Sequence, residues 1–347
     1  MKIVIAETLY PVGHKSLDEK FIETLSSLGE LLVINSNGYF SNKICEEYRT
    51  KTIKQFIPKY FEFIYTIVYF INLCIVAFNL RKEAYDKIIF LSTRIDSLFF
   101  ALPFFRKDSI IVVHHNDIDR MLSRPFESFI FKRYMNEIDH VVLAEFIKDG
   151  LIEKTSVDER RVHVVHQPSL EKRSVEDMNL DTRKPVVIGL GQSMSQDYID
   201  TLIAEDKNGD LDSKYRLLLR SKKTDYQGKF VSVSTEYLDR KVYDERLLTS
   251  SACIVFYPKS FNLRYSGVID DALNHGLVVY CNDIAVGKHF AKKYPNSCRL
   301  INEGEGLIPT LKSSIAAADE EEIKHFLLEH SEAFVTQQWK RCLDSDQ

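Results

Sequence analysis

The stretch that decides the fold is Tyr257-Pro-Lys-Ser-Phe-Asn-Leu-Arg-Tyr-Ser-Gly-Val-Ile-Asp-Asp-Ala-Leu-Asn-His-Gly276, followed directly by Leu277-Val-Val-Tyr280. The apolar residues from Cys253 predict a buried strand, and the loop after them predicts a helix that begins near Ser266. Gly276 is typical of a helix end, and the apolar run behind it predicts a second buried strand. This order of strand, loop, helix and strand indicates a parallel α/β sheet.

The same stretch contains the parts of an anion site. A helix N-terminus at the carboxyl end of a parallel strand presents free backbone N–H groups to a ligand. Arg264 lies just before the predicted helix and adds a cation, and Asp271 lies one turn inside it. Phosphates need the N–H groups and the cation, and a carboxylate suits two ribose hydroxyls. We therefore expect a nucleotide diphosphate as the ligand.

Short apolar strands alternate with helical patterns along all 347 residues, which predicts parallel sheets with helices on both faces. A polar stretch bounded by prolines divides the chain, so we expect domains at 1–170 and 185–320, a linker at 171–184 and a last helical segment at 321–347. The predicted strands are Lys2–Ala6, Leu31–Asn35, Lys87–Leu91, Ile110–Val113, His140–Leu143, Val162–Val165, Val186–Gly189, Arg216–Leu219, Phe230–Val233, Cys253–Tyr257 and Val278–Cys281.

The composition excludes several classes of protein. A net charge of −4 spread over the chain leaves no basic footprint for nucleic acid. The six cysteines are scattered without a Cys-x-x-Cys pair, which indicates reduced thiols rather than a disulfide framework or a zinc site. The N-terminal Met-Lys-Ile-Val-Ile-Ala predicts a strand and lacks the features of a signal peptide. These observations predict a cytoplasmic folded protein.

Residues 63–80 contain no charged side chain and are long enough to be a transmembrane candidate. Their place between two strands of one predicted sheet argues against a span, because crossing would separate those strands. Lys51, Lys54 and Lys59 precede the segment, and aromatic residues crowd its start. A core helix with a solvated basic flank and a helix that contacts a lipid surface are both open readings of residues 51–80.

The segment Tyr265-Ser-Gly-Val-Ile-Asp-Asp-Ala-Leu-Asn-His-Gly-Leu-Val-Val-Tyr-Cys-Asn-Asp283 resembles the donor segment of glycosyltransferase family 4 and its bacterial surface-polysaccharide relatives. The resemblance extends over nearly the whole chain but depends on a few short motifs. It implies a GT-B fold, in which two Rossmann-like domains with parallel sheets face a central cleft and a C-terminal helix crosses back to the N-terminal domain. It also implies that residues 1–170 bind acceptor and residues 185–320 bind the nucleotide sugar.

The resemblance implies roles for individual donor-site residues. Asp271 stands where the family has a ribose-binding glutamate, and Arg220 and Lys222 follow the second strand of the donor domain, where family cations reach the diphosphate. Gly191 follows the first strand of that domain and would let the backbone approach the phosphates. The implied donor-binding set is Gly191, Gln192, Arg220, Lys222, Tyr237, Tyr265, Ser266, Gly267 and Asp271, with Tyr237 beside the base.

Two further groups of residues complete the expected site. His115 would contact the donor sugar, with His114 as the alternative because the register of this strand end is open. His115 and Arg264 are the expected catalytic residues. The acceptor side is expected to hold Glu7, Gly13 and His14, and an acidic or histidine side chain there would be a general base if the reaction inverts.

Leu263 departs from the family pattern, because family 4 commonly has a second glutamate at this position, eight residues before Asp271. The departure leaves open whether the reaction retains or inverts configuration. It also keeps a non-catalytic GT-B partner subunit as an alternative, and a UDP-sugar 2-epimerase is a second one.

The function implied by the resemblance is sugar transfer from a nucleotide-diphosphate sugar, with a UDP-sugar as first choice, to a hydroxyl of a lipid-linked or oligosaccharide acceptor. The process would be bacterial surface polysaccharide synthesis, such as capsule or O-antigen. We expect a metal-independent enzyme without a cofactor beyond its substrate, in which cations and a helix N-terminus offset the charge of the leaving nucleotide. We expect it in the cytoplasm, with peripheral contact to the inner face of the cell membrane through residues 51–80.

Overall fold

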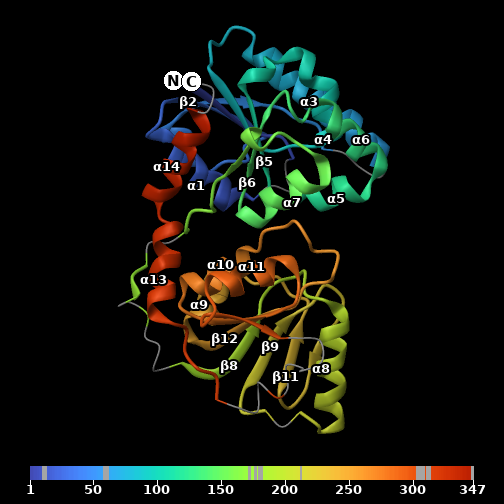
Figure 1. Cartoon of the computed structure of the whole chain (residues 1–347), viewed down its shortest axis with the longest axis vertical. Helices are drawn as coiled ribbons and strands as arrows, with labels where there is room; N and C mark the ends of the chain where they lie inside the picture. Colours follow the sequence, from blue (N-terminus) through green and yellow to red (C-terminus); the bar gives the residue numbers. More distant parts are fainter. Residues whose placement is uncertain are drawn as a thin grey trace. The chain divides into compact units, whose positions relative to one another are not determined.

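The computed structural model describes residues 1–9, 14–57, 62–170, 173–175, 178, 183–211, 213–301, 309 and 314–344. The chain forms two compact units, each built on a seven-stranded sheet with helices packed against it (Figure 1). The first unit comprises Met1–Leu170, Leu263–Tyr265 and His330–Gln347, and the second comprises Glu171–Asn262 and Ser266–Glu329.

The sheet of the first unit has the strand order β3-β2-β1-β4-β5-β6-β7, and all its neighbours are parallel. The order reverses between β1 and β4, where ligands bind in open α/β sheets. The strands are β1 (Lys2–Glu7), β2 (Glu30–Ser36), β3 (Arg49–Ile53), β4 (Lys87–Ser92), β5 (Ile110–His114), β6 (Asp139–Val142) and β7 (Val162–Val164). The helices are α1 (Lys15–Ser26), α2 (Asn42–Glu47), α3 (Glu62–Leu80), α4 (Ile95–Ala101), α5 (Asp117–Ser123), α6 (Pro125–Tyr134), α7 (Glu145–Thr155), α14 (Glu332–Leu343) and the short 3-10 turns η1 (Leu102–Phe104), η2 (Lys107–Ser109) and η3 (Glu159–Arg161).

The sheet of the second unit has the order β10-β11-β9-β8-β12-β13-β14, and only the β10–β11 pair is antiparallel. Its order reverses between β8 and β12. The strands are β8 (Lys184–Gly189), β9 (Arg216–Arg220), β10 (Tyr226–Gln227), β11 (Val231–Ser234), β12 (Ser250–Val255), β13 (Val278–Asn282) and β14 (Cys298–Ile301). The helices are α8 (Gln196–Asn208), α9 (Arg240–Thr249), α10 (Gly267–Asn274), α11 (Ala285–Lys293) and α13 (Glu320–Glu329).

The centres of both sheets are buried on both faces, as the near-continuous apolar runs of their strands require. Every residue of β4 and β5 is buried in the first unit, and every residue of β13 is buried in the second. The strands that the sequence predicts are all present, so the predicted α/β fold with parallel sheets is confirmed.

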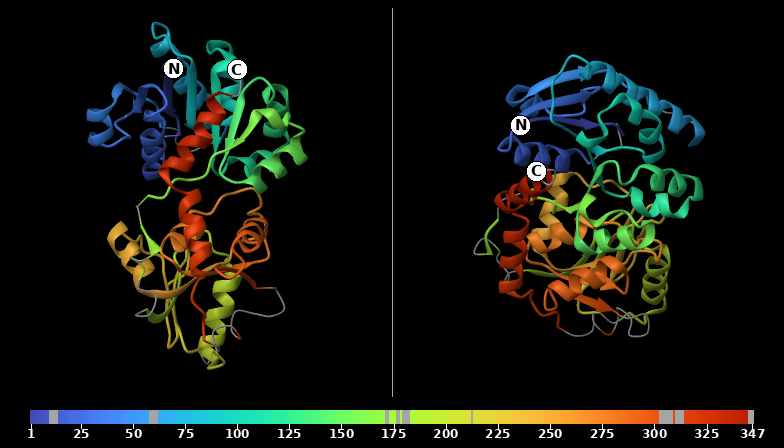
Figure 2. Two further views of the ribbon diagram at one scale, coloured as in Figure 1. Left: turned by 60° about the vertical axis from the view of Figure 1, so that its left-hand side comes forward. Right: turned by 45° about the horizontal axis from the view of Figure 1, so that its top comes forward.

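The predicted C-terminal helical segment is shared between the two units. The helical segment is divided in two, because Ser331 caps a new helix by accepting a hydrogen bond from the backbone N–H of Phe334. Before this break α13 lies in the second unit, and after it α14 packs on α1 in the first (Figure 2). The fully buried Trp339 meets Phe21 edge to face, with ring centroids 5.5 Å apart.

The uncharged segment forms one helix, α3. No helix in the described part of the chain is long and apolar enough to cross a membrane.

Candidate functional site

All the donor-site residues expected from the sequence except Tyr265 belong to the second unit, and Gly191, Ser266 and Gly267 lie where its strand order reverses. Gly191 follows β8, and a side chain there would lie 3.4 Å from Val268 and 3.7 Å from the Tyr257 hydroxyl. The turn after β8 therefore packs closely against the first turn of α10 and the residue that follows β12 by two positions.

Ser266 and Gly267 begin α10. The hydroxyl of Ser266 accepts a hydrogen bond from the N–H of Ile269 and is 2.8 Å from the Tyr257 hydroxyl, so the helix start is fixed to the end of β12. The first N–H groups of a helix have no partner inside it and carry its positive dipole end. The geometry expected for an anion site is present here, with the residue Ser266 as the cap.

Arg220 ends β9 with its side chain buried, and its Nε and Nη2 atoms have no hydrogen-bond partner among the described residues. Its guanidinium lies 5.6 Å from the ring centroid of Tyr237, whose side chain is 84% exposed. Arg246 is also near, and burial together with the charge of Arg220 lowers the Arg246 pKa. A buried cation beside an exposed aromatic ring suits a phosphate and a nucleobase.

Asp271 faces α9 from the middle of α10. One carboxylate oxygen accepts a hydrogen bond from the Tyr243 hydroxyl at 2.9 Å, and Arg240 lies 3.9 Å from the same oxygen. The carboxylate is thus held in place from one side. Gln192 and Lys222 of the predicted donor set are exposed.

Arg264 and Tyr265 belong to the first unit. The Arg264 guanidinium lies 3.1 Å from a carboxylate oxygen of Asp119, whose other oxygen accepts from the Leu263 N–H at 2.9 Å. Leu263 itself is buried, and its side chain fills the space beside Gly150 in α7. Arg264 is therefore engaged with a carboxylate in this structure, and the position of the missing family glutamate is packed as core.

The first unit has a cavity of about 190 Å³ where its own strand order reverses. It lies at the carboxyl ends of β1, β4 and β5, the position where open parallel sheets bind ligands. The lining residues are Leu9, His14, Ser92, Thr93, Arg94, Val113, His115, Asn116, Asp117 and Arg120.

His115, a predicted catalytic residue, lines this cavity together with His14 of the predicted acceptor side. Its ring lies 5.0 Å from that of His14, which contacts the Asn116 amide at 3.2 Å. The Nε2 atom of His115 has no hydrogen-bond partner among the described residues. Burial, followed by the neighbouring His14, lowers the pKa of His115 to about 3, so its ring is neutral and offers one donor and one acceptor.

His114 is committed to the interior instead. Its Nδ1 is 2.7 Å from Asp117, and its Nε2 is 3.0 Å from Nδ1 of His140. Of the two histidines, His115 is therefore the one with a ring nitrogen that has no partner among the described residues, and its contact with the donor sugar stays a prediction.

Glu7 lies behind the cavity lining. It is fully buried, accepts a 2.6 Å hydrogen bond from the Leu9 N–H and a short one from the Ser92 hydroxyl. Burial, with the charge of Asp18 as the second cause, raises its pKa to about 8. Glu7 is therefore mostly protonated at neutral pH. Gly13, predicted beside it, lies outside the described residues.

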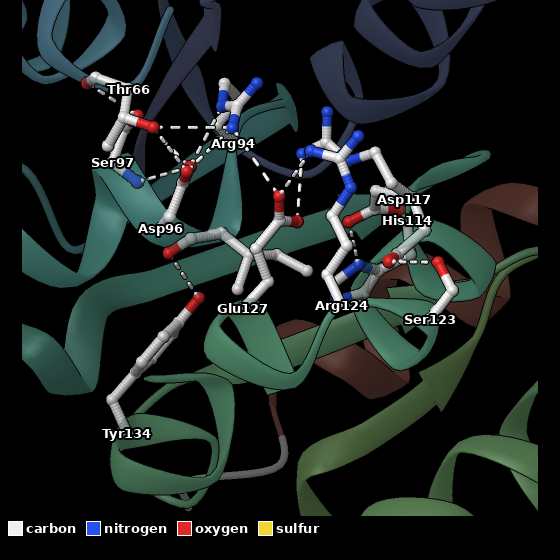
Figure 3. A network of polar contacts seen from close by, with 12 residues as sticks. Thr66, Arg94, Asp96, Ser97, His114, Asp117, Ser123, Arg124, Glu127 and Tyr134 are labelled. Atoms are coloured by element: carbon white, nitrogen blue, oxygen red, sulfur yellow. Dashed lines mark hydrogen bonds and ion pairs between the residues drawn. The ribbon is translucent and has the colours of Figure 1, made fainter. Parts of the chain in front are cut away.

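Sequence reasoning missed the charged network beneath the cavity, which Figure 3 shows. Arg94 is buried and makes two bonds to Asp96, at 2.9 and 2.7 Å, and lies 3.6 Å from Glu127. Glu127 also pairs with Arg120 and Arg124, both at 3.2 Å. This network holds Arg94 and Arg120 at the cavity wall.

Besides His115, three lining residues carry buried polar atoms without a partner among the described residues: Thr93 Oγ1, Asp117 Oδ1 and Arg120 Nε. Burial alone would raise the pKa of Asp117, but the adjacent His114 lowers it below its ordinary value. Asp117 is thus an ionised acceptor with one oxygen to offer. The signal that could have found Thr93 and Asp117 is their place just after β4 and β5, at the edge where the strands' carboxyl ends meet.

No protein-family model matches the chain, and no curated protein matches it in sequence. Solved structures match its fold over almost its whole length. HepE from Anabaena in complex with UDP-glucose aligns with a TM-score of 0.66 and 13% identity, covering 99% of this chain and 100% of its own. A glycosyltransferase from Rickettsia africae ESF-5 aligns with a TM-score of 0.65 and 13% identity, covering 99% and 97%. Sucrose-phosphate synthase from Thermosynechococcus elongatus aligns at 0.58 and 12%, covering 99% and 94%.

These likenesses confirm the GT-B fold that the sequence predicts. At such low identity they show the fold alone, so the chemistry depends on this chain's own residues.

Proposed function

We propose that the chain is a glycosyltransferase that moves a sugar from a nucleotide-diphosphate sugar to a hydroxyl acceptor. One observation carries the proposal: buried Arg220 keeps two guanidinium nitrogens without a partner among the described residues, beside the exposed ring of Tyr237. Leaving a buried cation unpaired is costly, and a diphosphate would supply the missing acceptors. UDP is the first choice of nucleotide, supported by the UDP-glucose complex of HepE, which shares the fold.

The second unit would bind the donor through five of its features. The Gly191 turn and the start of α10 would receive the phosphates, Arg220 would offset the charge that develops on the leaving diphosphate, and Asp271 would accept from the ribose hydroxyls. Tyr237 would stack on the base. No step in this scheme uses a metal ion, and metal independence stays a prediction that binding assays with EDTA test.

The first unit would bind the sugars through its cavity. Neutral His115 can donate or accept with a sugar hydroxyl, and Asp117 can accept from one. The raised pKa of Glu7, about 8, makes it a poor base below that pH, so we assign the acceptor hydroxyl to Asp117 instead. The family resemblance implies transfer with retention of configuration.

The acceptor in this proposal is a lipid-linked or oligosaccharide glycan in bacterial surface polysaccharide synthesis, such as capsule or O-antigen. The support is the family resemblance together with the apolar helix α3. The protein would then work in the cytoplasm, at the inner face of the cell membrane.

Replacing Arg220 by alanine tests the donor site. Losing a buried, charge-assisted contact to phosphate is expected to weaken UDP binding about tenfold or more. Isothermal titration calorimetry with UDP, with and without EDTA, measures the change. The matched control is Arg216→Ala, because Arg216 is exposed at the opposite end of the same strand. Equal UDP affinity in both variants would show that Arg220 at the end of β9 does not bind the diphosphate.

Buried Leu263 favours a second candidate, a partner subunit that binds the nucleotide sugar without transferring it. The two are separated by following release of UDP from UDP-sugars in the presence of glycan acceptors. UDP binding without any release would support the subunit. Conversion of the UDP-sugar to an epimer without release would support a 2-epimerase.

A further inference from the structure

The helices α3, α4 and α6 and the turn η1 expose large apolar side chains on the first unit. These elements contact one another in series, α3 with α4, and α4 with η1 and α6 (Figure 1). We call the exposed group Ile67, Ile71, Phe78, Phe104, Phe126 and Phe129 the outer apolar surface. Monomeric soluble proteins rarely expose apolar side chains in such a contiguous group, so a surface of this kind marks an interaction site.

Helix α3 is apolar on two opposite sides. Its inward side is buried through Leu73 and Val76, and its outward side repeats isoleucine at positions 67 and 71, which are 45% and 39% exposed. Phe78 lies on the same side of the helix, about two turns after Ile71, and is 66% exposed. A helix that is apolar all round is normally enclosed by protein or by lipid. No described part of the chain covers the outward side of α3.

The loop before α3 is held to that helix by hydrogen bonds and carries a further exposed aromatic side chain. The side-chain amide of Asn72 accepts from the Phe56 N–H at 2.8 Å and donates to the Phe56 carbonyl at 2.9 Å. The ring of Phe56 is 60% exposed. The exposure of Phe56 is therefore a consequence of ordered backbone contacts.

Cations stand at the edge of the outer apolar surface. The Arg81 guanidinium lies 5.1 Å from the Phe78 ring centroid, and that of Arg133 lies 4.8 Å from the Phe129 centroid. Lys132 is exposed beside Arg133, whereas the only acid of α6, Glu127, is buried and paired. Apolar and aromatic side chains with a basic rim are complementary to an anionic phospholipid surface.

We propose that the outer apolar surface seats the first unit on an anionic phospholipid membrane, where a lipid-linked acceptor is held. The inference deepens the proposed function and rests on it for the identity of that acceptor. Of the three lysines that precede α3, Lys51 donates to the Asn79 carbonyl at 2.6 Å, Lys54 is exposed, and Lys59 lies outside the described residues.

The network of Figure 3 connects this surface to the cavity. Thr66 on α3 donates to Asp96 at 2.6 Å, and Asp96 holds Arg94, which lines the cavity. Thr66 on α3 is thus joined by direct hydrogen bonds, through Asp96, to Arg94 in the cavity lining.

The test is co-sedimentation of the full chain with vesicles of phosphatidylcholine alone and with equal parts of phosphatidylglycerol. The wild type should bind the anionic vesicles better. Ile67→Ser with Ile71→Ser, and separately Phe126→Ser with Phe129→Ser, should each lower the partition coefficient about tenfold or more, because each pair removes two apolar side chains from lipid.

A separate double variant tests Arg81 and Arg133, the cations at the edge of the outer apolar surface. Arg81→Gln with Arg133→Gln should reduce binding to the anionic vesicles by about tenfold and leave binding to phosphatidylcholine unchanged. An equal loss on both kinds of vesicle would contradict the role assigned to charge.

Leu248→Ser with Leu328→Ser is the matched control, because these leucines are 45% and 62% exposed in the second unit. It should bind vesicles like the wild type, and circular dichroism checks that every variant is folded. Absence of vesicle binding, or wild-type binding by both apolar pairs, overturns the proposal. So does a dimer in free solution that the isoleucine pair converts to monomer, because a second copy would then cover the surface.

Vesicle binding needs no donor, so the two proposals fail separately. Lost vesicle binding with intact UDP affinity would leave the glycosyltransferase proposal standing. Intact vesicle binding without UDP affinity would do the reverse.

Discussion

His114 and His115 are neighbours in the sequence with opposite environments, because successive side chains at a strand end point to opposite sides. His114 is hydrogen-bonded to Asp117 and His140 in the interior. His115 lines the cavity and keeps Nε2 without a partner among the described residues. One position along the chain separates a structural histidine from a candidate for sugar binding.

Replacing each histidine by alanine should therefore give different results. His115→Ala is expected to lower kcat/KM about tenfold to a hundredfold with little change in melting temperature, because it removes a contact to substrate. His114→Ala should lower the melting temperature, because it breaks a buried network, and should affect kcat/KM only through Asp117, which His114 holds. Steady-state kinetics and thermal denaturation of both variants measure this. The reverse pattern would contradict the assignment.

Glu7 gives a prediction for the pH dependence of stability. Its folded pKa of about 8 lies above its ordinary value, so the folded state holds a proton that the unfolded state has lost. The contribution of this group to stability is therefore present below about pH 4.5 and is lost as the pH rises toward about 8, by up to about 1.4 kcal/mol per pH unit.

Glu7→Gln should remove this loss, because the amide cannot ionise. Urea denaturation at pH 5.5 and pH 8.5 should show a smaller difference for the variant than for the wild type. Exposed Glu46 supplies the control Glu46→Gln, which should leave the difference unchanged. An unaltered pH dependence in Glu7→Gln would mean that Glu7 is ionised in the fold.

At the scale of elements, the start of α10 is the feature that links stability to the candidate donor site. Ser266→Ala removes the cap and the contact to Tyr257, and is expected to cost about 1 kcal/mol of unfolding free energy and to weaken UDP binding. Ser331→Ala is the matched control, because Ser331 caps α14 in the same way. It should cost similar stability and leave UDP affinity unchanged. If both variants bind UDP equally, the α10 terminus does not bind phosphate.

The edge strands of the two sheets are the elements that the sequence pattern predicts least completely. The strands absent from the sequence prediction are β3, β10 and β14, and each lies at an edge of its sheet. The sequence of β3, Arg-Thr-Lys-Thr-Ile, carries the polar side chains that protect an edge strand from pairing with another chain. Central strands are buried on both faces and read as apolar runs, so they were predicted.

At the scale of the whole molecule, two units with separate cores should unfold in two transitions. Trp339→Ala is expected to destabilise the first unit by about 3–5 kcal/mol, because it empties the contact between α14 and α1. Differential scanning calorimetry should show one transition lowered by this variant and the other raised by UDP. If UDP raised the transition that Trp339→Ala lowers, the nucleotide would not be bound by the second unit alone.

The sequence by itself determined the α/β class, the parallel order of the central strands and the start of α10 beside Ser266, because local periodicity, a cap and a glycine stop need no knowledge of distant residues. Only the tertiary structure decided which side chains meet. Thr93 and Arg94 follow β4, Asp117 follows β5, and the sheet order brings these two strand ends to one cavity. The sequence also does not decide whether the outward side of α3 is covered by protein, because the apolar pattern of a helix face is the same in both cases.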